Sequence, residues 1–139
     1  MFRFAITTPV NTTKADPLVT ELPLRPGVIN LVHVAFPPGP VALAHVAVYR
    51  AGSLLWPTND DDGFAWDNFT LTFNPLERLE VEPFSLQART WNEDDTFEHL
   101  VVLRMNVLPL DIADQAGEEL TILQRLSDRL LGRRSATRG

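Results

Sequence analysis

The chain has 139 residues, of which 45% are hydrophobic, so it is long enough to form one domain with a substantial core. It contains no cysteine, which excludes disulfide scaffolds, thiolate zinc sites and thiol catalysis. No apolar run approaches the roughly 20 residues of a membrane helix, and the first residues lack the apolar block of a signal peptide. We therefore expect no membrane span and no export by that route.

Charge and proline content divide the chain into two parts. Eighteen acidic and twelve basic residues give a net charge of -6, and residues 1–110 carry all of that surplus. The remaining tail is neutral and places four of its five acidic residues ahead of its five arginines. All eleven prolines lie at or before Pro109, so we divide the chain into a body (1–109) and a tail (110–139). Because a nucleic-acid groove needs a basic face, the acidic body predicts no such groove.

The body has the alternating apolar pattern and the Pro, Gly, Asn and Asp turns that are typical of short β-strands. In chain order, the predicted strands cover residues 2–8, 18–24, 28–36, 41–51, 54–56, 69–73, 79–82, 86–91 and 97–108. We expect strand 86–91 to pair with strand 97–108 across the turn at residues 92–95. No helical stretch separates the strands, so parallel βαβ units are excluded. The sequence predicts a mainly β fold, an antiparallel β-sandwich of jelly-roll or Greek-key type with a C-terminal α-helix.

The predicted core consists of the inward-facing residues of these strands. In strand 97–108 the alternate positions from Phe97 and His99 to Val107 share one face. Across the body, the predicted core residues are Val28, Val32, Val34, Val46, Val48, Phe73, Val101, Leu103 and Met105.

Residues 118–131 of the tail predict an amphipathic helix, opened near Gly117 and capped by Gly132. Acidic residues stand in its first turn and arginines in its later turns, which suits the helix dipole. A helix of this length is marginal alone in water, so its leucines must pack on something. The partner is either the sandwich of the same chain or a neighbouring subunit or other protein. We predict association, through the candidate interaction residues Leu120, Leu123, Leu126, Leu130, Arg125 and Arg129.

Motifs for nucleotide binding, zinc proteolysis and serine hydrolysis are absent, so we predict no enzyme, no catalytic residue and no cofactor. His33, His45 and His99 stand in the middle of predicted strands and could meet around a metal, as in cupin-like barrels. The usual HxH spacing with a following glutamate is missing, so we assign no metal site. Residues 60–63 (DDDG) depart from the EF-hand spacing and are interpreted as a solvated turn, with a loosely held cation left open.

Three tryptophans leave a binding role open. Trp56, Trp66 and Trp91 could form a platform on which sugars stack, although tryptophans more often anchor a sandwich core or an interface.

Three segments of the body, taken together, resemble small β-sandwich virion proteins of tailed phages. They are ITTPVNTTKADPLVTELPL (6–24), FPPGPVALAHVAVYRAGSLLWPTNDDDGFAWD (36–67) and WNEDDTFEHLVVLRMNVLP (91–109). The resemblance lies in the layout of an extended arm followed by a compact sandwich. It implies a structural role as a head decoration, auxiliary capsid or connector protein, located in the virion or the cytoplasm. The implied partners are further copies of the chain and another capsid or assembly protein. The alternatives are a carbohydrate- or receptor-binding module and a small cupin-like metal-dependent enzyme.

Overall fold

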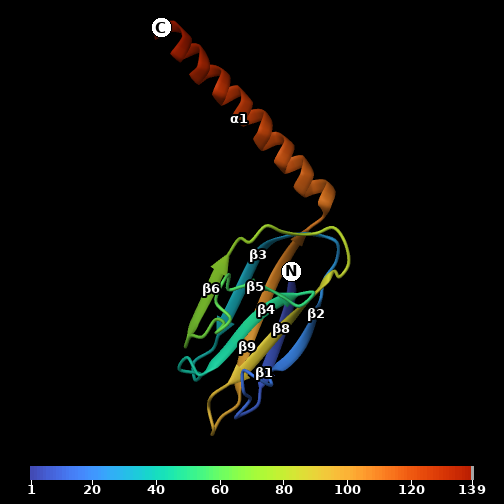
Figure 1. Ribbon diagram of the computed structural model, residues 1–139, viewed down its shortest axis with the longest axis vertical. Coiled ribbons are helices and arrows are strands. Elements are labelled where there is room, and N and C mark those ends of the chain that lie inside the picture. The colour runs from blue at the N-terminus through green and yellow to red at the C-terminus, as the bar shows by residue number, and fades with distance from the viewer. Residues whose placement is uncertain (139) are drawn as a thin grey trace.

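The computed structural model describes the backbone of residues 1–138 and the side chains of residues 1–130. Over these residues the chain forms two antiparallel sheets and one helix (Figure 1). Sheet A contains β1 (Phe2–Thr8), β9 (His99–Leu108), β3 (Gly27–Phe36), β6 (Phe69–Phe73) and β7 (Glu77–Leu79). Sheet B contains β2 (Leu18–Pro23), β8 (Ser85–Asn92), β4 (Ala44–Arg50) and β5 (Ser53–Trp56). The helix is α1 (Leu110–Arg138).

The strand pairing is that of a jelly roll. β1 pairs with β9, β2 with β8, β3 with β6, and β4 with β5. Strands at the two ends of the body therefore pair with each other, and so do the strands nearer its middle. β6 and β7 both pair with β3, one after the other, and together replace a single strand. The predicted antiparallel sandwich with a C-terminal helix is confirmed.

The predicted hairpin between strands 86–91 and 97–108 is wrong. β8 lies in sheet B between β2 and β4, whereas β9 lies in sheet A between β1 and β3. Both strands have one apolar face, and the sandwich buries both faces by placing the strands in opposite sheets. The segment between Asn92 and His99 therefore crosses from one sheet to the other.

Several strand boundaries differ from the predicted ones by one or two residues, and two differ by three residues for local reasons. β4 begins at Ala44, because Val41 and Ala42 have φ angles of 48° and 62°, which belong to a turn. The predicted strand 79–82 is displaced to β7, which ends at Leu79. The carbonyls that follow bond to a side chain instead, since the Arg50 guanidinium donates to Val81 O at 2.7 Å and to Pro83 O at 3.2 Å.

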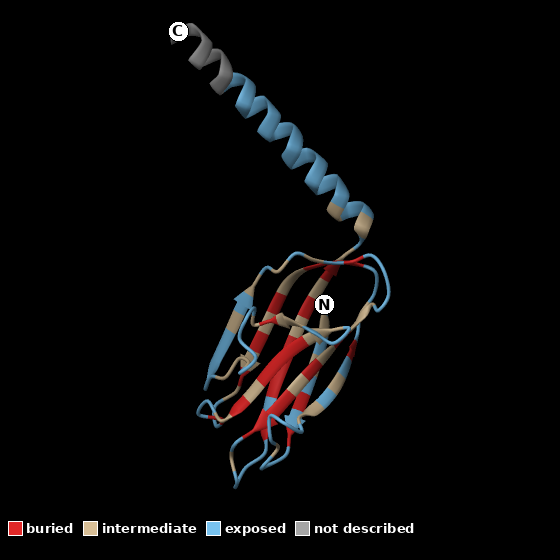
Figure 2. Cartoon of the chain, viewed as in Figure 1, coloured by how far each residue is buried: buried red, intermediate tan, exposed pale blue. Residues whose placement is uncertain are grey.

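The core lies between the two sheets, where Figure 2 shows the buried residues. Eight of the nine predicted core residues are buried, and Phe73 is half-buried at the margin, with its ring 5.5 Å from that of Trp56. The face of β9 that runs from His99 to Val107 is buried as predicted. Phe97 lies before the strand and is exposed.

The helix is longer than predicted at both ends. α1 starts directly after Pro109, whose carbonyl accepts a hydrogen bond from Ala113 N at 3.0 Å. It runs through Gly117 and Gly132, so the predictions that these glycines open and cap it are wrong. A single glycine costs a helix only about 1 kcal/mol, and good helix formers surround both positions. At about 1.5 Å per residue, its 29 residues extend roughly 40 Å away from the sandwich (Figure 1). Among the described residues, no helix is both long and apolar enough to cross a membrane.

Candidate functional site

The four predicted leucines form one stripe along α1 and face solvent. Their spacing of three and four residues places Leu120, Leu123, Leu126 and Leu130 on one side of the helix, because about 3.6 residues make a turn. Their side chains are between 50% and 67% exposed, and Figure 2 shows this part of the helix clear of the sandwich. Of the two partners left open by the sequence, the chain's own sandwich is therefore not the one that covers this stripe.

Arg125 and Arg129 do not belong to the leucine stripe. They are four residues apart and form a neighbouring row that flanks the leucines, with both side chains exposed. Ile122 adds to the apolar side and is 56% exposed. The structure thus gathers the predicted leucines into one surface and sets the predicted arginines at its border.

The start of α1 is fixed to the sandwich by an ion pair. Arg78 of β7 lies with its Nη2 3.0 Å from Oδ1 of Asp114, and the same guanidinium also binds Glu80. Hydrogen bonds to Glu80, and then to Asp114, raise the pKa of Arg78 above its usual value. The first turns of α1 are therefore held beside β7 while the leucine stripe projects beyond the body.

The three histidines lie in three separate environments. His33 is on β3 of sheet A, His45 is on β4 of sheet B, and His99 begins β9. Both ring nitrogens of His45 are engaged, Nδ1 by the carbonyl oxygen of Asp62 at 2.9 Å and Nε2 by Glu93 at 3.2 Å. Within the described residues, no three His, Cys, Asp or Glu side chains converge as metal ligands would. The convergence that the cupin-like alternative requires is therefore not found.

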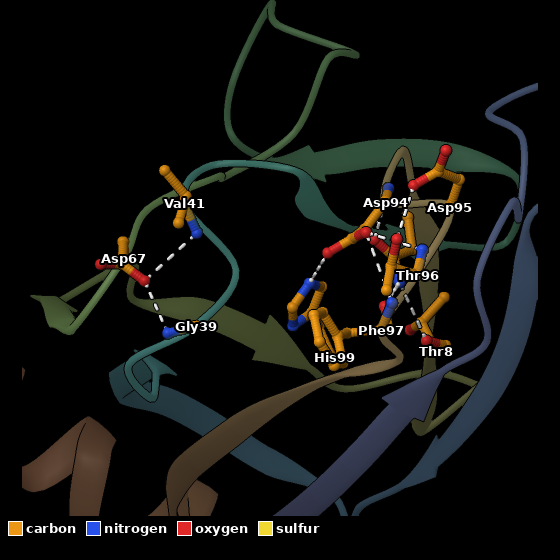
Figure 3. A network of polar contacts seen from close by, with 10 residues as sticks. Thr8, Gly39, Val41, Asp67, Asp94, Asp95, Thr96, Phe97 and His99 are labelled. Atoms are coloured by element: carbon orange, nitrogen blue, oxygen red, sulfur yellow. Dashed lines mark hydrogen bonds and ion pairs between the residues drawn. The ribbon is translucent and has the colours of Figure 1, made fainter.

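His99 and Asp94 are hydrogen-bonded to each other and stabilise the loop that crosses from β8 of sheet B to β9 of sheet A (Figure 3). Nε2 of His99 lies 2.8 Å from Oδ2 of Asp94, and Oδ1 of Asp94 accepts hydrogen bonds from the backbone N–H groups of Thr96 and Phe97. The Thr96 hydrogen bond, followed by that of His99, lowers the pKa of Asp94. The buried Asn92 donates to the carbonyls of Thr8 and Phe97 in the same region. These contacts fix the loop rather than present free groups.

A second anchor holds the neighbouring turn. Figure 3 shows Asp67 facing the backbone of Gly39 and Val41, and its Oδ1 accepts their N–H groups at 2.8 and 3.1 Å. These bonds stabilise the positive φ angles of the turn that precedes β4.

A cleft of about 590 Å³ opens at the end of the sandwich where the N-terminal arm, residues 9–17 between β1 and β2, meets the β8–β9 crossing. The ring of His45 stacks on Trp91, with 5.1 Å between the centroids, and Nζ of Lys14 lies 5.9 Å from the Trp91 centroid. Lys14 also binds Asp61 at 3.2 Å and Asp62 at 2.6 Å. The hydrogen bond between Lys14 and Asp62 raises the pKa of the lysine and lowers that of the carboxyl.

This arrangement was not predicted from the sequence. The acidic turn 60–63 holds the chain's own ammonium group, so it serves to attach the arm. One available signal was that Lys14 is the only lysine of the chain.

The tryptophans do not form a common platform. Trp56 and Trp91 are buried, and only Trp66 is partly exposed, at 39%. Its ring lies 5.5 Å from that of Phe69, which is 48% exposed. Of the three tryptophans, only Trp66 thus offers an exposed ring, beside that of Phe69.

Comparison with known protein families finds no family model that matches the chain, and no curated protein sequence matches it either.

Proposed function

We propose that this chain is a non-enzymatic structural protein of a virion, such as a head decoration, auxiliary capsid or connector subunit, and that α1 attaches it to the assembly. The observation that carries the proposal is the leucine stripe of α1, which projects from a closed sandwich and is covered by no other part of the described residues. Burial of a leucine contributes on the order of 1.5–3 kcal/mol, so four such residues favour association strongly.

Two further features support an assembly role. One is the resemblance of three segments of the body to small β-sandwich virion proteins of tailed phages. The other is that residues 9–17, where an extended arm was expected, form the loop between β1 and β2 and are fixed to the body, since Lys14 binds the acidic turn and Asn11 N donates to Asp94 O at 3.0 Å. A rigid body with one projecting helix suits a subunit that is added to a larger structure.

The test begins with the gene neighbourhood, where we expect a capsid gene, and continues with co-sedimentation of the purified full-length chain and shells made from that capsid protein. The full-length chain should sediment with the shells, and Leu123→Ser with Leu126→Ser should abolish this without changing the thermal unfolding of the body. Thr121→Ser, on the other side of the same helix, is the matched control. The absence of a capsid gene nearby, or sedimentation that is unaffected by the leucine changes, would overturn the proposal.

One observation favours a second candidate, a carbohydrate- or receptor-binding module. The exposed rings of Trp66 and Phe69 form a small aromatic surface of the kind on which sugars stack. Saccharides should then quench tryptophan fluorescence in the native chain but not in Trp66→Ala. Unchanged fluorescence across a glycan panel would remove this candidate.

A further inference from the structure

The outer face of sheet A carries a basic row that crosses all four of its main strands. Arg3 of β1 lies opposite Arg104 of β9, Arg104 lies opposite His33 of β3, and His33 lies opposite Thr72 of β6. These four residues are the basic row. Their burial pattern places their side chains on the face turned away from the core. The outward positions of these four strands include no acidic residue, in a body that carries thirteen.

The basic row lacks any partner within the described part of the chain. Neither arginine makes a side-chain hydrogen bond or ion pair there, although Arg25, Arg50 and Arg78 all do. Like charges placed directly opposite on adjacent strands destabilise a sheet. An acidic partner on this face would remove that penalty.

An apolar row lies immediately beside the basic one. Ala5 of β1, Val102 of β9 and Ala35 of β3 are directly opposite one another, and Leu100 extends the same surface toward the start of β9. Val102 is only 5% exposed, so Ala5, Ala35 and Leu100 form the accessible part of this row. Sheet A therefore presents basic and apolar strips side by side.

The tail helix presents the complementary combination. Its apolar side contains one acidic residue, Glu119, which stands three residues before Ile122 and four before Leu123 and is exposed. Glu118 also lies in the N-terminal half of the helix, where Asp114 is already paired with Arg78, whereas the described arginines Arg125 and Arg129 come later. An acidic and apolar helix surface and a basic and apolar sheet surface are thus both uncovered in one chain.

These two surfaces cannot meet within one copy. β9 ends at Leu108 and α1 begins at Leu110, so Pro109 alone joins them. One residue does not let the helix reverse and lie along the sheet from which it emerges, and Figure 1 shows it leading away. Pairing two copies of α1 with each other would bury the leucines but leave the basic row without an acidic partner.

We propose that α1 of one copy covers the outer face of sheet A of a second copy, with Glu119 against Arg3 and Arg104 and the leucine stripe on the apolar row. The inference rests on the proposed function, because it names the surface on which the attaching helix docks. It identifies a second copy of this chain as the partner.

Charge reversal in the full-length chain tests the contact. Arg104→Glu and Glu119→Arg should each weaken self-association by about tenfold or more in sedimentation velocity, because each leaves like charges in contact. Mixing the two variants should restore association, since each then supplies the charge that the other lacks. Arg3→Glu provides a second sheet variant should Arg104→Glu fail to fold. Arg89→Glu places the same change on the outer face of sheet B and should have no effect.

Cysteine cross-linking gives an independent readout, because the chain has no native cysteine. Ala35→Cys on the sheet and Ala116→Cys on the helix should form a cross-linked dimer with a short bismaleimide when the two variants are mixed. Either variant alone should form much less.

The outcomes separate this inference from the proposed function. Loss of association in both charge variants with rescue on mixing supports the docking of α1 on sheet A. Self-association that survives Arg104→Glu and Arg3→Glu but is lost in the leucine variant overturns the sheet as partner and leaves the attaching role of α1 standing. A full-length chain that remains monomeric also overturns the inference, and shell co-sedimentation then decides the proposed function alone.

Discussion

Arg78 and Asp114 join the two parts of the molecule, with Nη2 of the arginine 3.0 Å from Oδ1 of the aspartate. Arg78 belongs to the short strand β7 and Asp114 to the second turn of α1. Since both side chains are about half exposed, the pair fixes the direction of the helix more than it stabilises the fold.

Asp114→Asn should loosen only the start of α1. The ion pair to Arg78 is lost, while the sandwich keeps every core contact. Hydrogen exchange should quicken at residues 110–117, and the unfolding temperature of the body should not change. Asp128→Asn, farther along the helix, should leave exchange at those residues unaltered. Exchange rates that are equal in both variants would show that the pair does not orient the helix.

Leu103→Ala should destabilise the body by about 2–5 kcal/mol, because the side chain is fully buried between the sheets and its removal leaves a cavity. Leu100→Ala, on the opposite face of the same strand, should cost much less. Urea unfolding followed by tryptophan fluorescence measures both values. Similar losses for the two variants would contradict the assignment of the inner face.

Acid should destabilise the protein partly through Asp94. Its pKa in the folded state is lowered, so the carboxylate stabilises the fold above its usual value of 3.8, and this contribution is lost as the pH falls through the lowered pKa. The unfolding free energy of Asp94→Asn should therefore fall less steeply below pH 4 than that of the native chain, after a lower starting value at neutral pH. Asp95→Asn, one residue later, should keep the native slope. Parallel curves for the native chain and Asp94→Asn would refute the role of the carboxylate.

Lys14→Met should release the acidic turn from the N-terminal arm. The ammonium group binds Asp61 and Asp62 in an exposed setting, so salt screens the interaction. At low ionic strength, limited proteolysis should cut the variant faster than the native chain within residues 57–63. The difference should vanish near 1 M salt, where the Debye length is only about 3 Å. A difference that persists there would mean that the packing of the Lys14 side chain on Trp91 protects the turn more than its charge does.

Truncation after Pro109 should leave a body that unfolds cooperatively. The cut removes no strand, and the four leucines of the stripe are exposed and do not belong to the core. Thermal unfolding by circular dichroism checks this expectation. Aggregation of the truncated chain, or loss of its transition, would show that α1 is part of the folding unit.

The strands could be located from sequence because Pro, Gly, Asn and Asp mark nearly all of their ends. Alternation showed which residues of β8 and β9 face inward, but it could not show that they face each other from opposite sheets. The length of α1 was underestimated because Gly117 was interpreted as its start, whereas the helix formers before it outweigh one glycine.

The polar sites depend on tertiary register and were not accessible from sequence. Arg3 and Arg104 are far apart in the chain, and only the β1–β9 register brings them together. The same holds for Lys14 and the acidic turn. His99 and Asp94 are only five residues apart in the chain. The expected hairpin, however, would have put Asp94 in a tight turn within one sheet instead of in a loop that crosses between two sheets.

The pairing of Phe2 with Met105 also determines when the fold can form. β1 can pair only after β9 has been synthesised. Neither the complete sheet A nor the closed core can therefore form until nearly the whole body has been made. Chains dominated by such distant pairings fold slowly, in about milliseconds to seconds for small domains. Until β9 arrives, β1 and β3 have open edges that can pair with other chains. Nascent chains stalled before residue 99 should therefore bind chaperones. Binding should end once β9 has left the ribosome and can pair with β1 and β3.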